Sequence, residues 1–237
     1  MLNDHWWFAR IAPHPAPQGL RLQLRVVTLF YLLMYGIPAA ADLFFSGGVY
    51  ANTFSPPEMI FALSSSAALL ALFWYLARAE GGSWRNFYNP KFLANAWCIL
   101  LVPFVLALSQ WGLDRVFESL QKSFPGLAHF CSPHAAVISP VPWLYFLPTT
   151  LAYAIAEEAV SRGYLITRVR QSGAGLECAV FLSTLVYSAN HVGWGLNVFA
   201  AAVASGVVLA LIYARWGGLA GFILGRMVWE CSNYLKW

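Results

Sequence analysis

The sequence predicts an all-α protein, a polytopic membrane helix bundle of about seven transmembrane helices, with six to eight as the range. Three observations predict this class. Of the 237 residues, 59% are hydrophobic and only 10% are charged, whereas a soluble domain has about 25% charged residues. The mean hydropathy is +0.60. Apolar runs recur along the chain at close to the ~20 residues that a helix needs to cross the hydrocarbon.

The chain divides into two predicted parts. Residues 1–25 form a cytoplasmic or interfacial segment, because prolines and polar residues replace the continuous apolar core of a cleavable signal. Trp6, Trp7 and Phe8 suit an anchor in the headgroup zone. Residues 26–237 form a single membrane domain, whose motif-bearing half is 142–237. Its predicted spans, in order, are 26–45, 59–77, 92–112, 143–168, 177–193, 195–214 and 218–235.

The longest predicted loop, 113–142, joins the third and fourth spans. It contains His129 and His134. Two loop histidines without an acidic partner nearby are usually solvated, so we expect no metal there.

The distribution of Lys and Arg predicts a cytoplasmic N-terminus, because cytoplasmic loops carry an excess of these residues. Nine of them would then lie inside and three outside. The same asymmetry explains the net charge of +4, so we expect no nucleic-acid partner. The partner that we expect from these features is the lipid bilayer of a bacterial plasma membrane. The inside residues are Arg10, Arg21, Arg25, Arg78, Arg85, Lys91, Arg168, Arg170 and Arg215, and the outside residues are Arg115, Lys122 and Lys236.

Three charged residues interrupt the fourth predicted span. Glu157 and Glu158 are adjacent, and Arg162 follows one turn later. Each ionised side chain at bilayer depth costs roughly 2.5 to 3.5 kcal/mol on insertion scales, unless it pairs, neutralises or faces a wet cavity. Such a cluster indicates either a functional site or a helix clamp.

Polar residues of three predicted helices reach similar depths. At a rise of 1.5 Å per residue, Glu157 lies about 16 Å from the inner surface and His191 about 21 Å. The same rise places Trp229 and Asn233 about 21 to 27 Å deep in the last span. We therefore expect Glu157, His191 and Asn233 to face one common cavity.

The helical period separates the roles of the two glutamates. Glu158 and Arg162 are four residues apart and share a face, so an ion pair is the natural way to bury both charges. Glu157 points about 100° away from that face. A buried carboxylate that can still accept a proton suits a general base. We expect Glu157 to be that base, and the Glu158–Arg162 pair to orient it and balance charge.

Two motifs carry a family resemblance. Glu157-Glu158-Ala-Val-Ser-Arg162 resembles the Glu-Glu-x-x-x-Arg motif of the CPBP family, the intramembrane CAAX prenyl protease and bacteriocin-processing (Abi) proteins. Tyr187-Ser-Ala-Asn-His191 is similar to the family's second motif, in which Phe commonly holds the place of Tyr187. The resemblance implies a glutamic-type endopeptidase in which Glu157 and His191 activate a water that attacks a peptide carbonyl. The partner that it implies is a membrane-associated peptide or protein substrate.

The third motif of that family, His-x-x-x-Asn, supplies oxyanion donors, and this chain departs from it. Trp229-Glu-Cys-Ser-Asn233 keeps the Asn and has Trp at the His position, while Arg226-Met-Val-Trp-Glu230 is an alternative register. An indole N–H donates one hydrogen bond but does not titrate. In the first register, Trp229 and Asn233 would bind the oxyanion.

Other classes fit the sequence less well. His-Glu-x-x-His is absent, and His191 is the only histidine in the predicted spans, which argues against a catalytic metal with three or four protein ligands. We expect no cofactor. Two other functions stay open: a catalytically silent relative that acts in peptide binding, export or immunity, and, with less support, a proton-coupled transporter.

Overall fold

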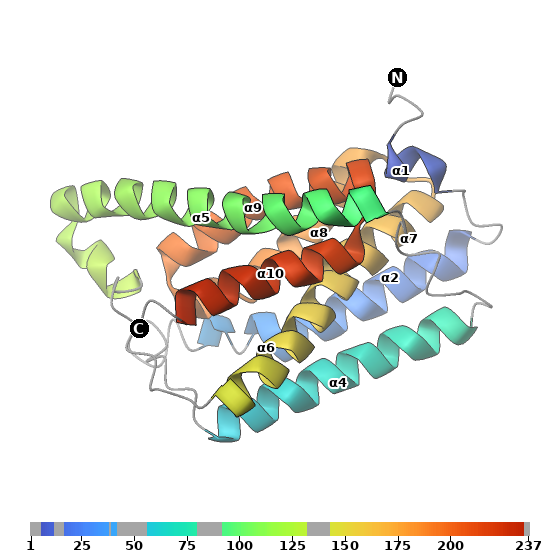
Figure 1. Ribbon diagram of the computed structural model, residues 1–237, viewed down its shortest axis with the longest axis horizontal. Coiled ribbons are helices and arrows are strands. Elements are labelled where there is room, and N and C mark those ends of the chain that lie inside the picture. Colours follow the sequence, from blue (N-terminus) through green and yellow to red (C-terminus); the bar gives the residue numbers. More distant parts are fainter. Residues whose placement is uncertain are drawn as a thin grey trace.

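The computed structural model describes residues 6–11, 17–37, 39–41, 56–79, 92–131 and 143–234, and every regular element in these ranges is a helix. The predicted all-α class is confirmed, and Figure 1 shows the arrangement. The α-helices are α1 (Trp7–Arg10), α2 (Pro17–Tyr31), α4 (Pro56–Ala79), α5 (Phe92–Ser123), α6 (Trp143–Glu158), α7 (Leu165–Gln171), α8 (Leu176–Ala189), α9 (Leu196–Trp216) and α10 (Leu219–Tyr234). Two π-helices, η1 (Leu32–Gly36) and η4 (Ala159–Tyr164), and two 3₁₀ helices, η3 (Pro125–Phe130) and η5 (Val192–Trp194), complete the set.

Three helical stretches of the described residues are long and apolar enough to cross a membrane: Gln23–Ala41, Asn95–Ser123 and Leu196–Trp216. The second and fifth predicted spans contain shorter apolar stretches, Leu63–Leu72 and Leu176–Ala189. The protein is thus a polytopic helix bundle with apolar spans. The total of seven spans, and the division at residue 25, stay predictions.

Helix α5 corrects one sequence expectation. The predicted loop, 113–142, is wrong in its first third, because α5 continues to Ser123. The apolar run ends near residue 112, but the helix continues with polar residues that support it. The Gln110 side chain donates a hydrogen bond to Asp114, one turn away, at 2.9 Å. Helix α5 therefore ends later than its apolar run.

Of the two histidines in the predicted loop, the structure describes only His129. His129 lies in η3, with its ring 5.1 Å from that of Phe130, edge to face. His134 lies outside the described residues.

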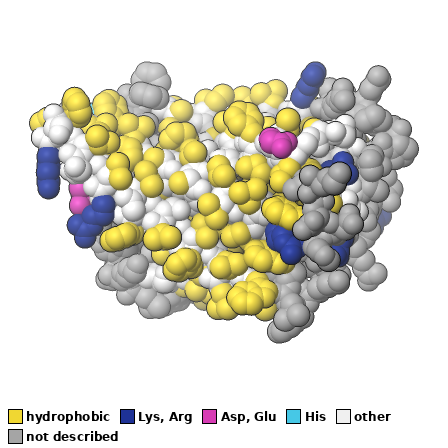
Figure 2. All heavy atoms as spheres, turned by 90° about the horizontal axis from the view of Figure 1, so that it is seen from above, with side chains coloured by type: hydrophobic (Ala, Val, Ile, Leu, Met, Phe, Trp, Pro, Cys, Tyr) yellow, Lys and Arg dark blue, Asp and Glu magenta, His cyan; other side chains and the backbone are white. Residues whose placement is uncertain are grey.

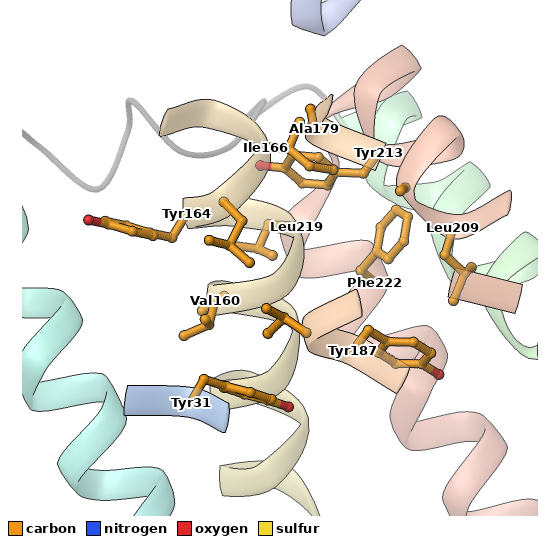
Figure 3. Packing of buried hydrophobic residues seen from close by; sticks show 14 of the residues in the cluster. Tyr31, Val160, Tyr164, Ile166, Ala179, Tyr187, Leu209, Tyr213, Leu219 and Phe222 are labelled. Atoms are coloured by element: carbon orange, nitrogen blue, oxygen red, sulfur yellow. The ribbon is translucent and has the colours of Figure 1, made fainter. Parts of the chain in front are cut away.

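One continuous helix occupies the centre of the bundle. It runs through α6, η4 and α7, and it contacts α4, α8, α10 and α2. Every residue from 156 to 169 is buried. Figure 3 shows the surrounding hydrophobic core, in which the rings of Tyr213 and Phe222 pack edge to face at 5.7 Å. The acidic motif therefore lies at the best-shielded place in the described fold.

Two glycines allow α10 to lie close against α5. A Cβ at Gly221 would overlap the Asn95 carbonyl, and one at Gly225 would lie 2.8 Å from the Val102 Cβ. Gly-x-x-x-Gly in an apolar helix lets two backbones approach in this way. Since Arg226 follows Gly225, this packing turns its side chain away from α5 and toward the central helix.

The outer surface is apolar. Figure 2 shows hydrophobic side chains over the middle of one face and most charged side chains toward its two ends. Helix α5 carries a stripe of exposed residues at helical spacing, which are Leu100, Phe104, Leu108 and Trp111. Because lipid is as apolar as these side chains, such a stripe is stable in a bilayer.

Candidate active site

The adjacent glutamates end α6, at the start of the π-helix η4. Their relative exposures are 1% for Glu157 and 0% for Glu158. In a π-helix the hydrogen bonds run from i to i+5, and such segments often occur at functional sites. The sequence periodicity predicted an uninterrupted α-helix here. The structure instead widens the turn that carries Arg162.

The expected ion pair between Glu158 and Arg162 is present. Arg162 Nε lies 3.8 Å from Glu158 Oε2, and both side chains are fully buried. The guanidinium also donates to Ser183 Oγ at 3.2 Å and lies over the Tyr187 ring, with Cζ 4.3 Å from its centroid. Arg162 therefore binds Glu158 within the central helix, formed by α6, η4 and α7, and also links this helix to α8.

The Glu157 carboxylate has a different environment. Tyr153 donates a hydrogen bond to its Oε1 at 3.3 Å, and the Asn190 side chain lies within hydrogen-bonding range. The other oxygen, Oε2, accepts no hydrogen bond from the described residues and lies 3.6 Å from Arg226 Nη2. Glu157 Oε2 is thus a buried oxygen that can still accept a hydrogen bond.

His191 lies just beyond a helix, not within one. The sequence predicts His191 inside the span 177–193, but α8 ends at Ala189. The chain turns there toward Gly195, which has a φ of 109°, a conformation that glycine adopts readily. The His191 Nδ1 lies 2.9 Å from the Tyr187 carbonyl oxygen. Because a carbonyl can only accept, Nδ1 carries the hydrogen. Because Arg226 Nη2, 3.3 Å from Nε2, can only donate, Nε2 keeps its lone pair.

Arg226 of α10 joins these groups. Its side chain is 7% exposed. Its Nη2 lies 3.3 Å from His191 Nε2, and its Nη1 donates to the Tyr187 hydroxyl at 2.7 Å. On the outer side, its Nε lies 2.9 Å from Glu230 Oε1. One guanidinium therefore contacts Glu157, His191, Tyr187 and Glu230.

The two residues of the first register lie further along α10. Trp229 is partly buried and packs against the hydrophobic core, and Asn233 is partly exposed. Asn233 follows Arg226 by seven residues, which is about 10 Å along the helix axis. The contacts from α10 to Glu157 and His191 given above come from Arg226. The oxyanion roles of Trp229 and Asn233 stay predictions. The convergence of Asn233 with Glu157 stays a prediction.

The site combines a carboxylate, a neutral imidazole and a guanidinium in the buried interior of the bundle. Within the part of the chain that the structure describes, no group of three or more His, Cys, Asp or Glu side chains is arranged to hold a metal. A carboxylate beside an imidazole can take a proton from water, and a guanidinium can stabilise a developing negative charge. These are the elements of acyl-transfer chemistry.

Sequence reasoning gave Arg226 too little weight and did not single out Tyr153, Asn190 or Ser183. A signal for Arg226 was available, because an ionisable residue inside an apolar helix is a functional candidate by default. The other three are ordinary polar residues whose neighbours only the fold reveals.

Comparison with known proteins finds one family model that matches part of the chain. Residues 139–232 match the family model of type II CAAX prenyl endopeptidase Rce1-like proteins. No curated protein and no solved structure matches the chain significantly. The matched segment contains the central helix (α6, η4 and α7), α8, α9 and most of α10. At the level of the family, the match supports an integral membrane protein of the CAAX protease class, a hydrolase that acts on a membrane-embedded peptide or protein. Residues 139–232 are therefore similar to the type II CAAX prenyl endopeptidase Rce1-like family, in agreement with the resemblance of their motifs to the CPBP family.

Proposed function

We propose that this protein is an intramembrane endopeptidase in which Glu157, with His191, activates a water to cleave the tail of a membrane-associated peptide or protein. The observation that carries the proposal is the environment of Glu157 Oε2. This oxygen is buried, accepts no hydrogen bond from the described residues, and lies within 3.6 Å of the nitrogen that also contacts His191 Nε2. Because Glu157 Oε2 and His191 Nε2 both lie close to Arg226 Nη2, one or two waters can bridge the carboxylate and the imidazole.

The reaction follows from these acceptors. Glu157 takes a proton from the water while His191 Nε2 accepts a hydrogen bond from the same molecule. The water oxygen bonds to the peptide carbonyl carbon, and the C=O π electrons move to the oxygen. When the tetrahedral intermediate collapses, the C–N bond breaks and its electron pair stays on nitrogen. The proton held by Glu157 passes to that nitrogen, so the products are a carboxylic acid and an amine and the enzyme is regenerated.

The Glu158–Arg162 pair has a positioning role in this proposal. It is sealed from solvent and fixed to α8 through Ser183. Because Glu158 is bonded to Glu157 through the backbone, holding this pair rigid also holds the Glu157 side chain at its angle. A buried pair of this kind balances its own charge, so Glu157 stays available for the water.

The proposal includes the orientation of the chain. Arg170 lies over the Phe8 ring at 5.5 Å, and Arg215 lies over the Trp6 ring at 5.9 Å. The N-terminal aromatic residues thus lie beside cations that the positive-inside rule assigns to the cytoplasm. This proximity supports an N-terminus at the cytoplasmic face.

The test uses a defined tail. Purified protein in liposomes is mixed with a quenched-fluorescence peptide that ends in a farnesylated Cys-aliphatic-aliphatic-X sequence, the signal of CAAX processing. We expect the native protein to release the tail and Glu157→Gln to leave it intact. Arg115→Met is the control, because the Arg115 side chain is exposed and pairs with Glu118 on its own helix, α5. The same peptide without the lipid shows whether the prenyl group is required. A native protein that leaves both peptides intact contradicts the proposal.

One observation favours a second candidate, the catalytically silent relative that binds or escorts a peptide. Arg226 contacts both groups that would activate the water. If it blocks them permanently, the native protein and Glu157→Gln should bind the farnesylated peptide with equal affinity and cleave none of it. Peptide binding measured in the same liposomes separates the two candidates.

A further inference from the structure

We propose that Arg226 donates hydrogen bonds to the substrate carbonyl as it gains charge, and that Tyr187 is the positioning residue that holds the Arg226 guanidinium at that place. This inference rests on the proposed endopeptidase function and deepens it.

The contact distances show what holds Arg226. Its short contacts are to the Tyr187 hydroxyl, at 2.7 Å, and to Glu230, at 2.9 Å. Its contacts to His191 and Glu157 are longer, at 3.3 Å and 3.6 Å. Charge-assisted hydrogen bonds to a committed partner are typically about 2.7–2.9 Å long, and Arg–carboxylate pairs are often bidentate. Arg226 is therefore anchored by a hydrogen bond to Tyr187 and by an ion pair with Glu230, in which Nε is not aligned for a hydrogen bond. It only approaches Glu157.

Charge balance supports the same assignment. Glu230 is the nearer carboxylate to Arg226, and it lies on the same helix, one turn away. The cation therefore has a partner that is independent of Glu157. An arginine that served only to neutralise Glu157 would not need a second carboxylate at a shorter distance.

The guanidinium also has donors to spare. It carries five N–H groups in a planar fork. One Nη1 hydrogen is directed to the Tyr187 hydroxyl, and Nη2 faces the space shared by His191 and Glu157. A carbonyl oxygen that arrives beside the activated water would meet Nη2. Preorganised donors aimed at a developing oxyanion are usually the largest single contribution to acyl-transfer catalysis.

Tyr187 is built to position its neighbours. Its hydroxyl accepts from Arg226, its backbone carbonyl accepts from His191 Nδ1, and its ring lies under the Arg162 guanidinium. The ring itself is buried. Gly206 of α9 packs against it, because a Cβ there would lie 3.2 Å from Tyr187 Cδ1. A phenylalanine could keep the ring contacts, but only a tyrosine can accept the hydrogen bond from Arg226. The two departures from the family pattern, Tyr187 and Arg226, thus complement each other.

The experiment is a double-mutant cycle measured with the farnesylated quenched-fluorescence peptide. We expect Arg226→Met to lower kcat by about 100- to 1,000-fold, the cost of losing one oxyanion donor, while KM changes little. Arg226→Lys keeps the charge and loses the fork, so it should retain more activity than Arg226→Met. If Arg226→Met does not accumulate in the membrane, Arg226→Lys provides the test of the donor role in its place. Arg115→Met is the matched control for the removal of an arginine.

The cycle tests the positioning role of Tyr187. Tyr187→Phe should lower kcat by about five- to tenfold, the worth of one hydrogen bond. In the Arg226→Met background the same change should have almost no further effect, because the group to be positioned is gone. Additive effects would overturn the role of Tyr187.

Three results for Arg226 are distinguishable. A kcat of Arg226→Met within about threefold of the native value, far less than the loss of an oxyanion donor would cause, overturns the donor role, and faster cleavage shows that Arg226 blocks the site. In both cases the proposed endopeptidase function stands. Failure of that function appears in the native protein itself, which would then leave the peptide intact, and the Arg226 assignment falls with it.

Discussion

The two buried ion pairs of the site differ in how the chain brings their members together. Glu158 and Arg162 belong to one helix, four residues apart, and both are completely buried. Glu157 and Arg226 belong to α6 and α10, separated by almost 70 residues, and their distance is determined by how α10 packs on the central helix. The first pair is a local clamp. The second depends on tertiary packing, and each of its members also contacts other groups.

The largest expected effect separates the two glutamates. Glu157→Gln removes the proposed base and should lower cleavage by about 100- to 10,000-fold, the usual contribution of general acid–base catalysis. The isosteric amide leaves packing intact, so the amount of protein in the membrane should stay at the native level. Immunoblots of the membrane fraction, alongside the liposome assay, measure both quantities.

Arg162→Ala should act on stability instead. It leaves the Glu158 carboxylate buried without its cation, and breaking a buried pair in this way costs about 3 to 5 kcal/mol. We expect a strong fall in membrane abundance and in thermal stability. The double variant Glu158→Gln with Arg162→Met should recover part of the loss. If Glu157→Gln and Arg162→Ala lower abundance equally, the distinction between clamp and catalytic pair is wrong.

The third prediction concerns the packing that places Arg226. Gly225→Ala puts a methyl group 2.8 Å from the Val102 Cβ, and such overpacking typically costs 1–3 kcal/mol. It should push α10 away from α5 and move Arg226, so we expect a moderate loss of both thermal stability and cleavage.

Gly112→Ala is the matched control for this change, because nothing lies within 4 Å of a Cβ at that position of α5. It should be neutral or slightly stabilising, since alanine favours a helix. Equal effects of the two substitutions would show that the close approach of α5 and α10 is unimportant.

Ser183→Ala should have the smallest effect. It removes one acceptor of the Arg162 guanidinium, which keeps its contacts with Glu158 and the Tyr187 ring. We expect a loss of about 1 kcal/mol of stability and nearly native cleavage. Ser64→Ala, at an exposed serine that bonds only within its own helix, is the control. A loss of cleavage as large as that of Glu157→Gln would move Ser183 into the catalytic group.

Local pattern was sufficient for the features that depend on neighbours in the chain. Hydropathy predicted the all-α membrane class, and the four-residue spacing predicted the Glu158–Arg162 pair. It was less reliable at helix ends. Helix α5 runs beyond its apolar stretch, and α8 stops before His191. Apolar length measures the thickness of a bilayer, whereas a helix ends where its backbone hydrogen bonds find another partner or a glycine lets the chain turn.

By itself the sequence determined that the protein is helical and membrane-spanning, and that its acidic motif is costly enough to require ion pairing or a function. Only the tertiary structure brings Arg226 of α10 to that motif. Trp229 with Asn233 and Arg226 with Glu230 are both spaced by four residues, so the helical period admits either register. The close packing of Gly221 and Gly225 on α5 rotates α10 so that Arg226 faces Glu157 and His191. The rotation of a helix about its axis depends on contacts with distant segments, and no local pattern contains that information.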